Sequence, residues 1–185
     1  MGLGDGLMAS GEVRELRKKN PSAKFIIGDG YRSYWNDVFD YNPYIIRGSE
    51  AKNYKQIIWI QNYEGNRPYR NYGANFPKDN YNWKKSYNPK KGELFFSEKE
   101  RNIAKQIVSE IRKKTSKKII FIEPHIKKRL GYENRNWGFH KWEKIVQELK
   151  KDYEFIQITY GDRKSIMGCI NINGLNFRCS AAVLS

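Results

Sequence analysis

The stretch GLGDGLMASGEVRELRKKNPSAKFIIG, residues 2–28, indicates the fold class because it joins a helix pattern directly to a strand pattern. Ala9, Val13 and Leu16 recur at i, i+4 and i+7, which places them on one face of a helix. An Asn-Pro pair ends that helix, and residues 23–28 form an apolar run that predicts a short buried strand. Helix and strand in alternation are the building pattern of an α/β domain.

The front of this stretch predicts a functional loop. Gly2, Gly4 and Gly6 surround Asp5, and we expect a glycine-rich loop that leads into the helix start. Backbone N–H groups and the positive end of a helix favour an anion at such a place, and glycines let a ligand come close to the backbone. Asp5 is therefore a candidate functional carboxylate. The alternative is that Asp5 only caps the helix.

Strand and helix patterns alternate twice, on either side of a basic segment at 112–118. This arrangement predicts an α/β protein with parallel sheets and two domains, 1–114 and 115–185. The predicted strands span 23–28, 44–46, 55–60, 118–122, 153–159 and 169–172. Four more helices are predicted. One spans 31–39, one follows a capping box at 97–100, one contains the apolar positions within 142–149, and one begins at 177.

Residues 62–92 differ from the rest of the chain. They are dense in Tyr, Asn, Pro, Gly, Lys and Arg and show little periodicity, which predicts a long surface excursion. Interleaved aromatic and cationic side chains suit sugar stacking, phosphate contact or single-stranded nucleic acid. An irregular cover packed over the sheet edge fits the same composition.

The charge balance points to an anionic partner. There are 35 Lys and Arg residues against 20 Asp and Glu residues, for a net charge of +15. Nucleic acid, an acidic membrane surface or a phosphorylated small molecule would suit this surplus, and so would simple solvated surface charge. Cys169 and Cys179 match no metal-ligand spacing, and no apolar run approaches the roughly 18 residues that a spanning helix needs. With no signal peptide visible, we expect a cytoplasmic protein.

Three motifs in a fixed order resemble glycosyltransferase family 9, the ADP-heptose–lipopolysaccharide heptosyltransferase group. The first covers 2–8, 12–17 and 21–24, the second covers 122–125 and 135–142, and the weaker third covers 174–178 and 181–184. The resemblance implies a GT-B-like fold: a Rossmann-like acceptor-side domain, and the incomplete start of a second Rossmann-like domain that binds the donor.

The resemblance also implies an inverting, metal-independent transfer of a heptose-like sugar, with no cofactor. Asp5 would be the general base, with Gly4 and Gly6 in the acceptor loop. The implied donor-binding residues are His125, Lys127, Lys128, Arg135 and Gly161. The implied partners are an ADP-heptose-like nucleotide-sugar donor and an anionic glycan or glycolipid acceptor, met at the inner face of the membrane.

The sequence departs from the family pattern in three places. No strand precedes the glycine loop, the chain stops before the family's donor motif, and Arg135 stands where the family has a lysine. These departures predict a gene product truncated at both ends. Such a product could be an inactive fragment.

A basic nucleic-acid-binding module is the main alternative, although no RNP, KH, zinc-finger or helix-turn-helix signature is present. A Rossmann-type enzyme with another reaction is weaker, since residues 2–6 are not a full G-x-G-x-x-G.

Overall fold

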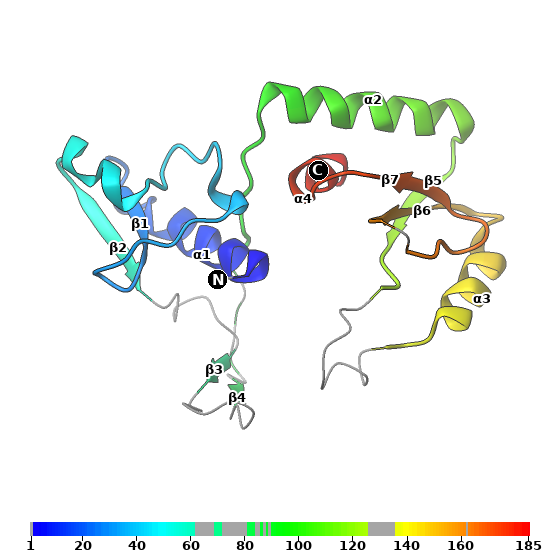
Figure 1. Cartoon of the computed structure of the whole chain (residues 1–185), viewed down its shortest axis with the longest axis horizontal. Helices are drawn as coiled ribbons and strands as arrows, with labels where there is room; N and C mark the ends of the chain where they lie inside the picture. The colour runs from blue at the N-terminus through cyan, green and yellow to red at the C-terminus, as the bar shows by residue number, and fades with distance from the viewer. Residues whose placement is uncertain are drawn as a thin grey trace. The chain divides into compact units, whose positions relative to one another are not determined.

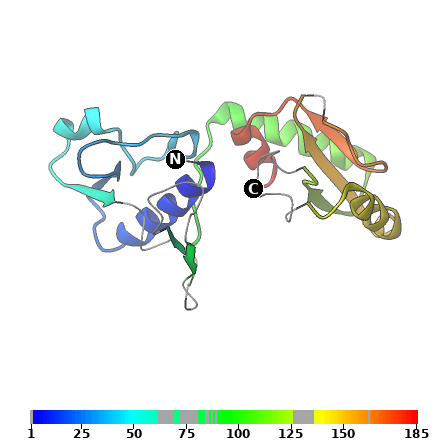
Figure 2. The same ribbon diagram turned by 60° about the horizontal axis from the view of Figure 1, so that its bottom comes forward.

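Parallel strands and helices build both halves of the computed structural model (Figures 1 and 2). The structure describes residues 2–61, 69–71, 81–83, 86, 88, 90–125, 136–161 and 163–185. The chain divides into two compact units, Met1–Ser97 and Glu98–Ser185. The prediction of a mixed α/β protein with parallel sheets is confirmed. The boundary lies before the long helix of the second unit, whereas the sequence predicts it at 114/115.

Unit 1 contains helix α1 (Leu3–Leu16), strand β1 (Lys24–Gly28), the 3-10 turns η1 (Asp37–Phe39) and η2 (Gly48–Asn53), and strand β2 (Ile57–Gln61). Strand β1 pairs in parallel with β2, from Lys24 opposite Ile57 to Gly28 opposite Gln61. Its other edge makes a parallel bridge between Phe25 and Ile45. Strand β1 therefore has partners on both sides, and its side chains from Phe25 to Ile27 are fully buried. The predicted strand at 44–46 is reduced to this single bridge.

The predicted helix at 31–39 is wrong. Only η1 has helical turns there, and Ser33 pairs antiparallel with Gly28. The Asp29 carboxylate accepts the backbone N–H groups of Tyr31 and Arg32 at 2.9 and 2.7 Å. Because these N–H groups bond a side chain and the chain folds back along β1, no helix can nucleate at this point.

The 62–92 stretch contains two short strands, β3 (Tyr69–Asn71) and β4 (Tyr81–Trp83), which pair antiparallel. The predicted irregular excursion thus includes a small two-stranded ladder. Most of its other residues lie outside the described part of the chain.

Unit 2 contains α2 (Glu98–Lys114), β5 (Lys118–Ile122), α3 (Phe139–Leu149), β6 (Tyr153–Thr159), β7 (Ile170–Asn173) and α4 (Phe177–Val183). Its three strands are parallel in the order β5-β6-β7. Helices α2 and α4 lie together on one side of this sheet, and α3 lies on the other (Figures 1 and 2). The strands and helices predicted for this half are confirmed, with ends shifted by a few residues.

The core of unit 2 lies between the sheet and α3. Ile122, Val146, Phe155 and Ile166 are its buried residues, and Trp142 and Ile145 of α3 pack against them. Period-3.6 spacing in α3 and period-2 spacing in the strands bring these side chains to one interface.

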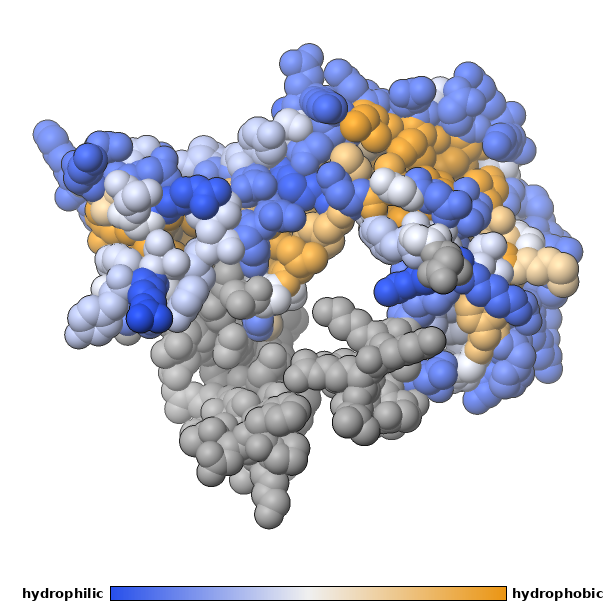
Figure 3. All heavy atoms as spheres, viewed as in Figure 1, coloured by the Kyte–Doolittle hydropathy of each residue, from blue (hydrophilic) through white to orange (hydrophobic). Residues whose placement is uncertain are grey.

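The opposite face is covered less completely. Of the predicted apolar stripe on α2, Ala104 and Ile111 are buried, while Ile103, Ile107 and Val108 are half-exposed. Apolar side chains accordingly show on the surface next to α2 and α4 (Figure 3). Among the described residues, no helix has the length and apolarity to cross a membrane.

Candidate functional site

Asp5 lies in the first turn of α1, and its carboxylate acts there as a cap. Its Oδ2 accepts the backbone N–H of Gly2 at 3.1 Å. An acidic side chain at this position satisfies a helix N–H that has no carbonyl partner within the helix, and it complements the positive helix end. The capping interpretation of Asp5 is therefore observed. The role of Asp5 as a general base stays a prediction.

The predicted glycine loop is wrong in one respect, because the helix already begins at Leu3 and includes both Gly4 and Gly6. Gly4 is exposed, and a Cβ atom on it would meet nothing within 4 Å. Gly6 is buried, and a Cβ there would lie 2.6 Å from the Asn36 amide nitrogen. That Asn36 side chain caps η1 by accepting from the Val38 N–H at 3.0 Å. Close packing against Asn36 therefore explains why position 6 is a glycine. No comparable contact with a described residue requires a glycine at position 4.

A second candidate site lies at the carboxyl edge of the unit 2 sheet. Because β5, β6 and β7 are parallel, their carboxyl ends share one edge, which is where open α/β sheets bind ligands. The polar residues in or just after these strand ends are Glu123, His125, Thr159, Tyr160, Asn171 and Asn173.

His125 follows β5 and is held in place by Glu123. The Oε1 atom of Glu123 accepts the His125 backbone N–H at 2.8 Å and lies 2.9 Å from the ring Nδ1. The ring also packs against Phe139, with ring centroids 5.9 Å apart. Its Nε2 atom is buried and has no hydrogen-bond partner among the described residues. The histidine is therefore fixed through Nδ1, and the hydrogen-bonding capacity of Nε2 is not used by the described residues.

The next strand ends place a hydroxyl and two amides together. Thr159 Oγ1 lies 2.9 Å from Asn171 Oδ1 and also contacts Asn173 Oδ1. Asn171 Nδ2 donates to Asn173 Oδ1 at 3.2 Å. Both asparagines are exposed and lie two residues apart on β7, so they share one face of the sheet. A hydroxyl has one proton, so Thr159 can donate to one oxygen at a time, and the group keeps hydrogen-bonding capacity for a polar ligand.

Gly161 lies just beyond β6, at the same edge as His125. Its φ is +63°, the left-handed region, and a Cβ would meet nothing within 4 Å. Backbone conformation is therefore the reason for glycine at this position. Tyr160 beside it contacts Ser180 of α4, with 2.9 Å between the two hydroxyl oxygens. The other predicted donor-binding residues, Lys127, Lys128 and Arg135, lie outside the described residues.

Neither cysteine is placed for thiolate chemistry. Burial, with a smaller effect from the Glu154 charge, raises the pKa of Cys169 to about 11, and Cys179 is buried. Within the described ranges, no group of three or more His, Cys, Asp or Glu side chains is arranged to hold a metal ion.

No protein-family model, curated protein or solved structure matches this chain. The resemblance to glycosyltransferase family 9 therefore stays a prediction.

Sequence reasoning missed several of these positions. Glu123, Asn171 and Asn173 were not candidates, although the alternation of Ile and Asn along 170–173 is a signal for polar side chains on one face of an edge strand. The pairing of Glu123 with His125 has no signal beyond their proximity in sequence.

Proposed function

We propose that this chain is a glycosyltransferase polypeptide whose second unit binds a nucleotide-sugar donor. The proposed reaction moves a heptose-like sugar onto an anionic glycan or glycolipid with inversion and without a metal. The observation that supports it best is the polar carboxyl edge of the parallel sheet in unit 2.

The chemistry of that edge suits the two halves of such a donor. The exposed amide groups of Asn171 and Asn173, which the buried Thr159 hydroxyl contacts, match sugar or ribose hydroxyls, which both donate and accept. The Nε2 atom of His125, which has no hydrogen-bond partner among the described residues, suits a polar atom of the donor. The basic sequence that follows His125, with Lys127 and Lys128, would stabilise the nucleoside diphosphate as it leaves.

Asp5 is the proposed general base, as the family resemblance implies. A carboxylate offers about four lone-pair sites, so the bond from the Gly2 N–H does not exhaust its capacity to accept a proton. The acceptor oxygen would attack the anomeric carbon while its proton passes to Asp5 and the bond to the diphosphate breaks.

Asp5→Asn separates this role from capping. The amide oxygen of asparagine can still accept the Gly2 N–H, so stability and donor binding should change little. Transfer should fall by about 100-fold or more, the usual contribution of general base catalysis. The measurement is single-turnover transfer together with donor titration. Equal transfer rates in the variant and the wild type would exclude the base role.

The donor site is tested by calorimetric titration with ADP-, GDP- and UDP-sugars. Asn173→Ala should weaken donor binding by about fivefold, since a hydrogen bond to a ligand contributes roughly 1 kcal/mol. Asn102→Ala, an exposed asparagine on α2, is the matched control and should leave binding unchanged. An absence of binding to any nucleotide sugar would count against the proposal. Retention on single-stranded RNA that falls steeply with salt would then favour the nucleic-acid-binding alternative, which the charge of +15 supports.

A further inference from the structure

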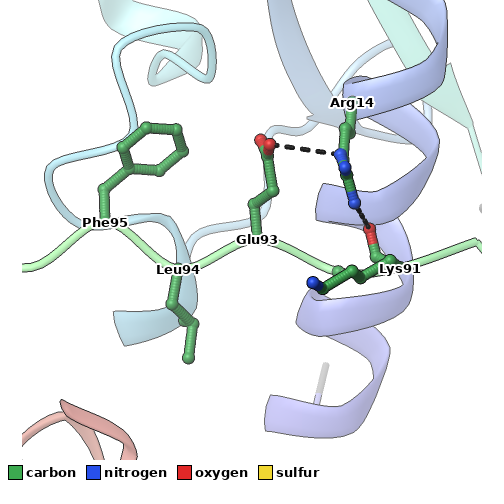
Figure 4. A pocket seen from close by; sticks show the side chains of 6 residues that line it. Arg14, Lys91, Glu93, Leu94 and Phe95 are labelled. Carbon is green, nitrogen blue, oxygen red and sulfur yellow. Dashed lines mark hydrogen bonds and ion pairs between the residues drawn. The ribbon is translucent and has the colours of Figure 1, made fainter. Parts of the chain in front are cut away.

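Unit 1 contains a pocket that the proposed function does not use. It lies between α1 and the segment 91–95, and its volume is about 310 Å³, at the lower end of the range for small-ligand sites (Figure 4). The residues that line it are Arg14, Lys91, Gly92, Glu93, Leu94 and Phe95.

The walls of this pocket are fixed by local contacts. Ser10 Oγ accepts the Glu93 N–H at 3.0 Å and donates to the Leu7 carbonyl at 2.9 Å. Gly92 runs so close to α1 that a Cβ on it would lie 2.9 Å from the Leu7 oxygen. Arg14 Nη1 also reaches the Lys91 carbonyl at 3.5 Å, as Figure 4 shows. The pocket is therefore formed before any ligand arrives, which lowers the entropic cost of binding.

The charges around the pocket do not balance. Glu93 Oε1 lies 3.3 Å from Arg14 Nε and 2.8 Å from Arg17 Nη2, so one carboxylate serves two guanidinium groups. Lys91 adds a third cation to the lining. Arg17 is stacked over Tyr44, with its guanidinium carbon 4.2 Å from the ring centroid, and its buried Nη1 has no hydrogen-bond partner among the described residues. The pocket lining itself therefore has two cations, Arg14 and Lys91, against one carboxylate, Glu93.

We propose that this pocket binds a phosphate monoester group. Arg14 and Lys91 against Glu93 leave the pocket lining with a surplus positive charge, and Arg17, which shares Glu93, adds to its attraction for the charge of −1.5 to −2 that a phosphate monoester has at pH 7. The planar guanidinium of Arg14 matches two phosphate oxygens at once. Leu94 and Phe95 supply an apolar wall for the organic part of the ester. The group can belong to a small phosphate ester or to a lipid headgroup, and the inference does not depend on the proposed glycosyltransferase activity.

The test is calorimetric titration of the full chain with phenyl phosphate and with inorganic phosphate. Arg14→Gln should weaken binding by about tenfold or more, since bonds to charged groups are the stronger ones. Glu93→Gln should strengthen binding several-fold, because it removes the competing negative charge and keeps an amide in place. Arg32→Gln, an exposed arginine of unit 1 whose side chain has no part in the pocket, is the control and should bind as the wild type does.

Opposite effects of the two pocket variants cannot come from loss of folding alone. If circular dichroism shows that Arg14→Gln does not fold, Arg14→Lys replaces it, because lysine keeps the charge without the two-pronged geometry. No binding of either phosphate compound or of phosphatidic acid by folded wild type would overturn the proposal. Equal weakening by Arg14→Gln and Arg32→Gln, or weaker binding by Glu93→Gln, would overturn it as well.

Vesicles distinguish the two sources of the phosphate group. Phosphatidic acid has a phosphate monoester, whereas phosphatidylglycerol has a diester. If the protein prefers phosphatidic acid vesicles to phosphatidylglycerol vesicles of the same surface charge, and Arg14→Gln removes this preference, the pocket binds a lipid headgroup. Binding of phenyl phosphate without that preference assigns it to a small ester. Equal binding to both lipids with no binding of phenyl phosphate would reduce the interaction to general surface attraction and refute the pocket.

Discussion

Among the described ion pairs of unit 2, the buried pair between Glu100 and Arg178 should cost the most stability to break. Arg178 Nε donates to Glu100 Oε1 at 2.6 Å, and Nη2 donates to Oε2 at 3.0 Å. The two side chains are only 13% and 6% exposed, so each charge depends on the other for the solvation it has lost. The pair joins α2 to the short helix α4 across 78 residues of sequence.

Replacing Glu100 by glutamine should lower the free energy of unfolding by about 3–5 kcal/mol, because it leaves a buried guanidinium without its counter-charge. Glu110→Gln is the matched control. The Glu110–Lys113 pair on the same helix is 56% and 67% exposed, and the solvent screens such pairs so well that they contribute little to stability. A double variant, Glu100→Gln with Arg178→Met, should lose less than the sum of the two single variants, since no buried charge then stays unpaired.

Urea denaturation, followed by hydrogen exchange in peptides from unit 2, measures the free energy of unfolding of unit 2 separately from that of unit 1. With a slope of about 1–3 kcal/mol per molar urea, a loss of 4 kcal/mol moves the midpoint by more than about 1 M. The reasoning would be refuted if Glu100→Gln and Glu110→Gln moved the midpoint equally. Strict additivity in the double variant would also refute it, because it would show that the two groups do not interact.

Two further predictions concern the glycines and the thiol. Gly28→Ala should destabilise the protein by about 1–3 kcal/mol, because its Cβ would lie 2.1 Å from the Arg32 carbonyl oxygen, whereas Gly4→Ala, in open space on a helix, should stabilise it by up to about 1 kcal/mol. Thermal melting compares the two variants, and equal shifts would contradict the packing argument. Cys169 should react with iodoacetamide more slowly at pH 8 than in the unfolded chain, since its pKa of about 11 keeps the thiol protonated. Because the folded pKa lies above the ordinary value of 9, this group should also lose its stabilising effect as pH rises from about 9 to about 11, which pH-dependent denaturation of wild type and Cys169→Ser would detect.

Local pattern was enough for most of unit 2. Strand β6 at Tyr153–Thr159 agrees with its prediction, and β5 and β7 differ by a residue or less at each end. Helices α2 and α3 follow from apolar residues at helical spacing. Runs of β-branched residues and periodic stripes of this kind act within a few residues, so they can be interpreted without the rest of the molecule.

The candidate site was harder to predict from sequence. His125 and Gly161 lie at the sheet edge where a strand-then-turn pattern places them. Thr159, Asn171 and Asn173 become a group only because β6 and β7 pair in parallel with Thr159 opposite Asn173. Strand register depends on pairing partners, and no single strand's sequence specifies which residue of its neighbour it will face.

The sequence alone determined the alternation of helices and strands, the surplus of positive charge, and the acid at the start of the first helix, because each is a property of neighbouring residues or of composition. Only the tertiary structure decided that Gly4 and Gly6 lie inside α1, that 31–39 folds back along β1, and that Glu93 joins Arg14 and Arg17. These outcomes depend on contacts between segments as far as 79 residues apart, whose energies exceed the local preferences that a short sequence window can express.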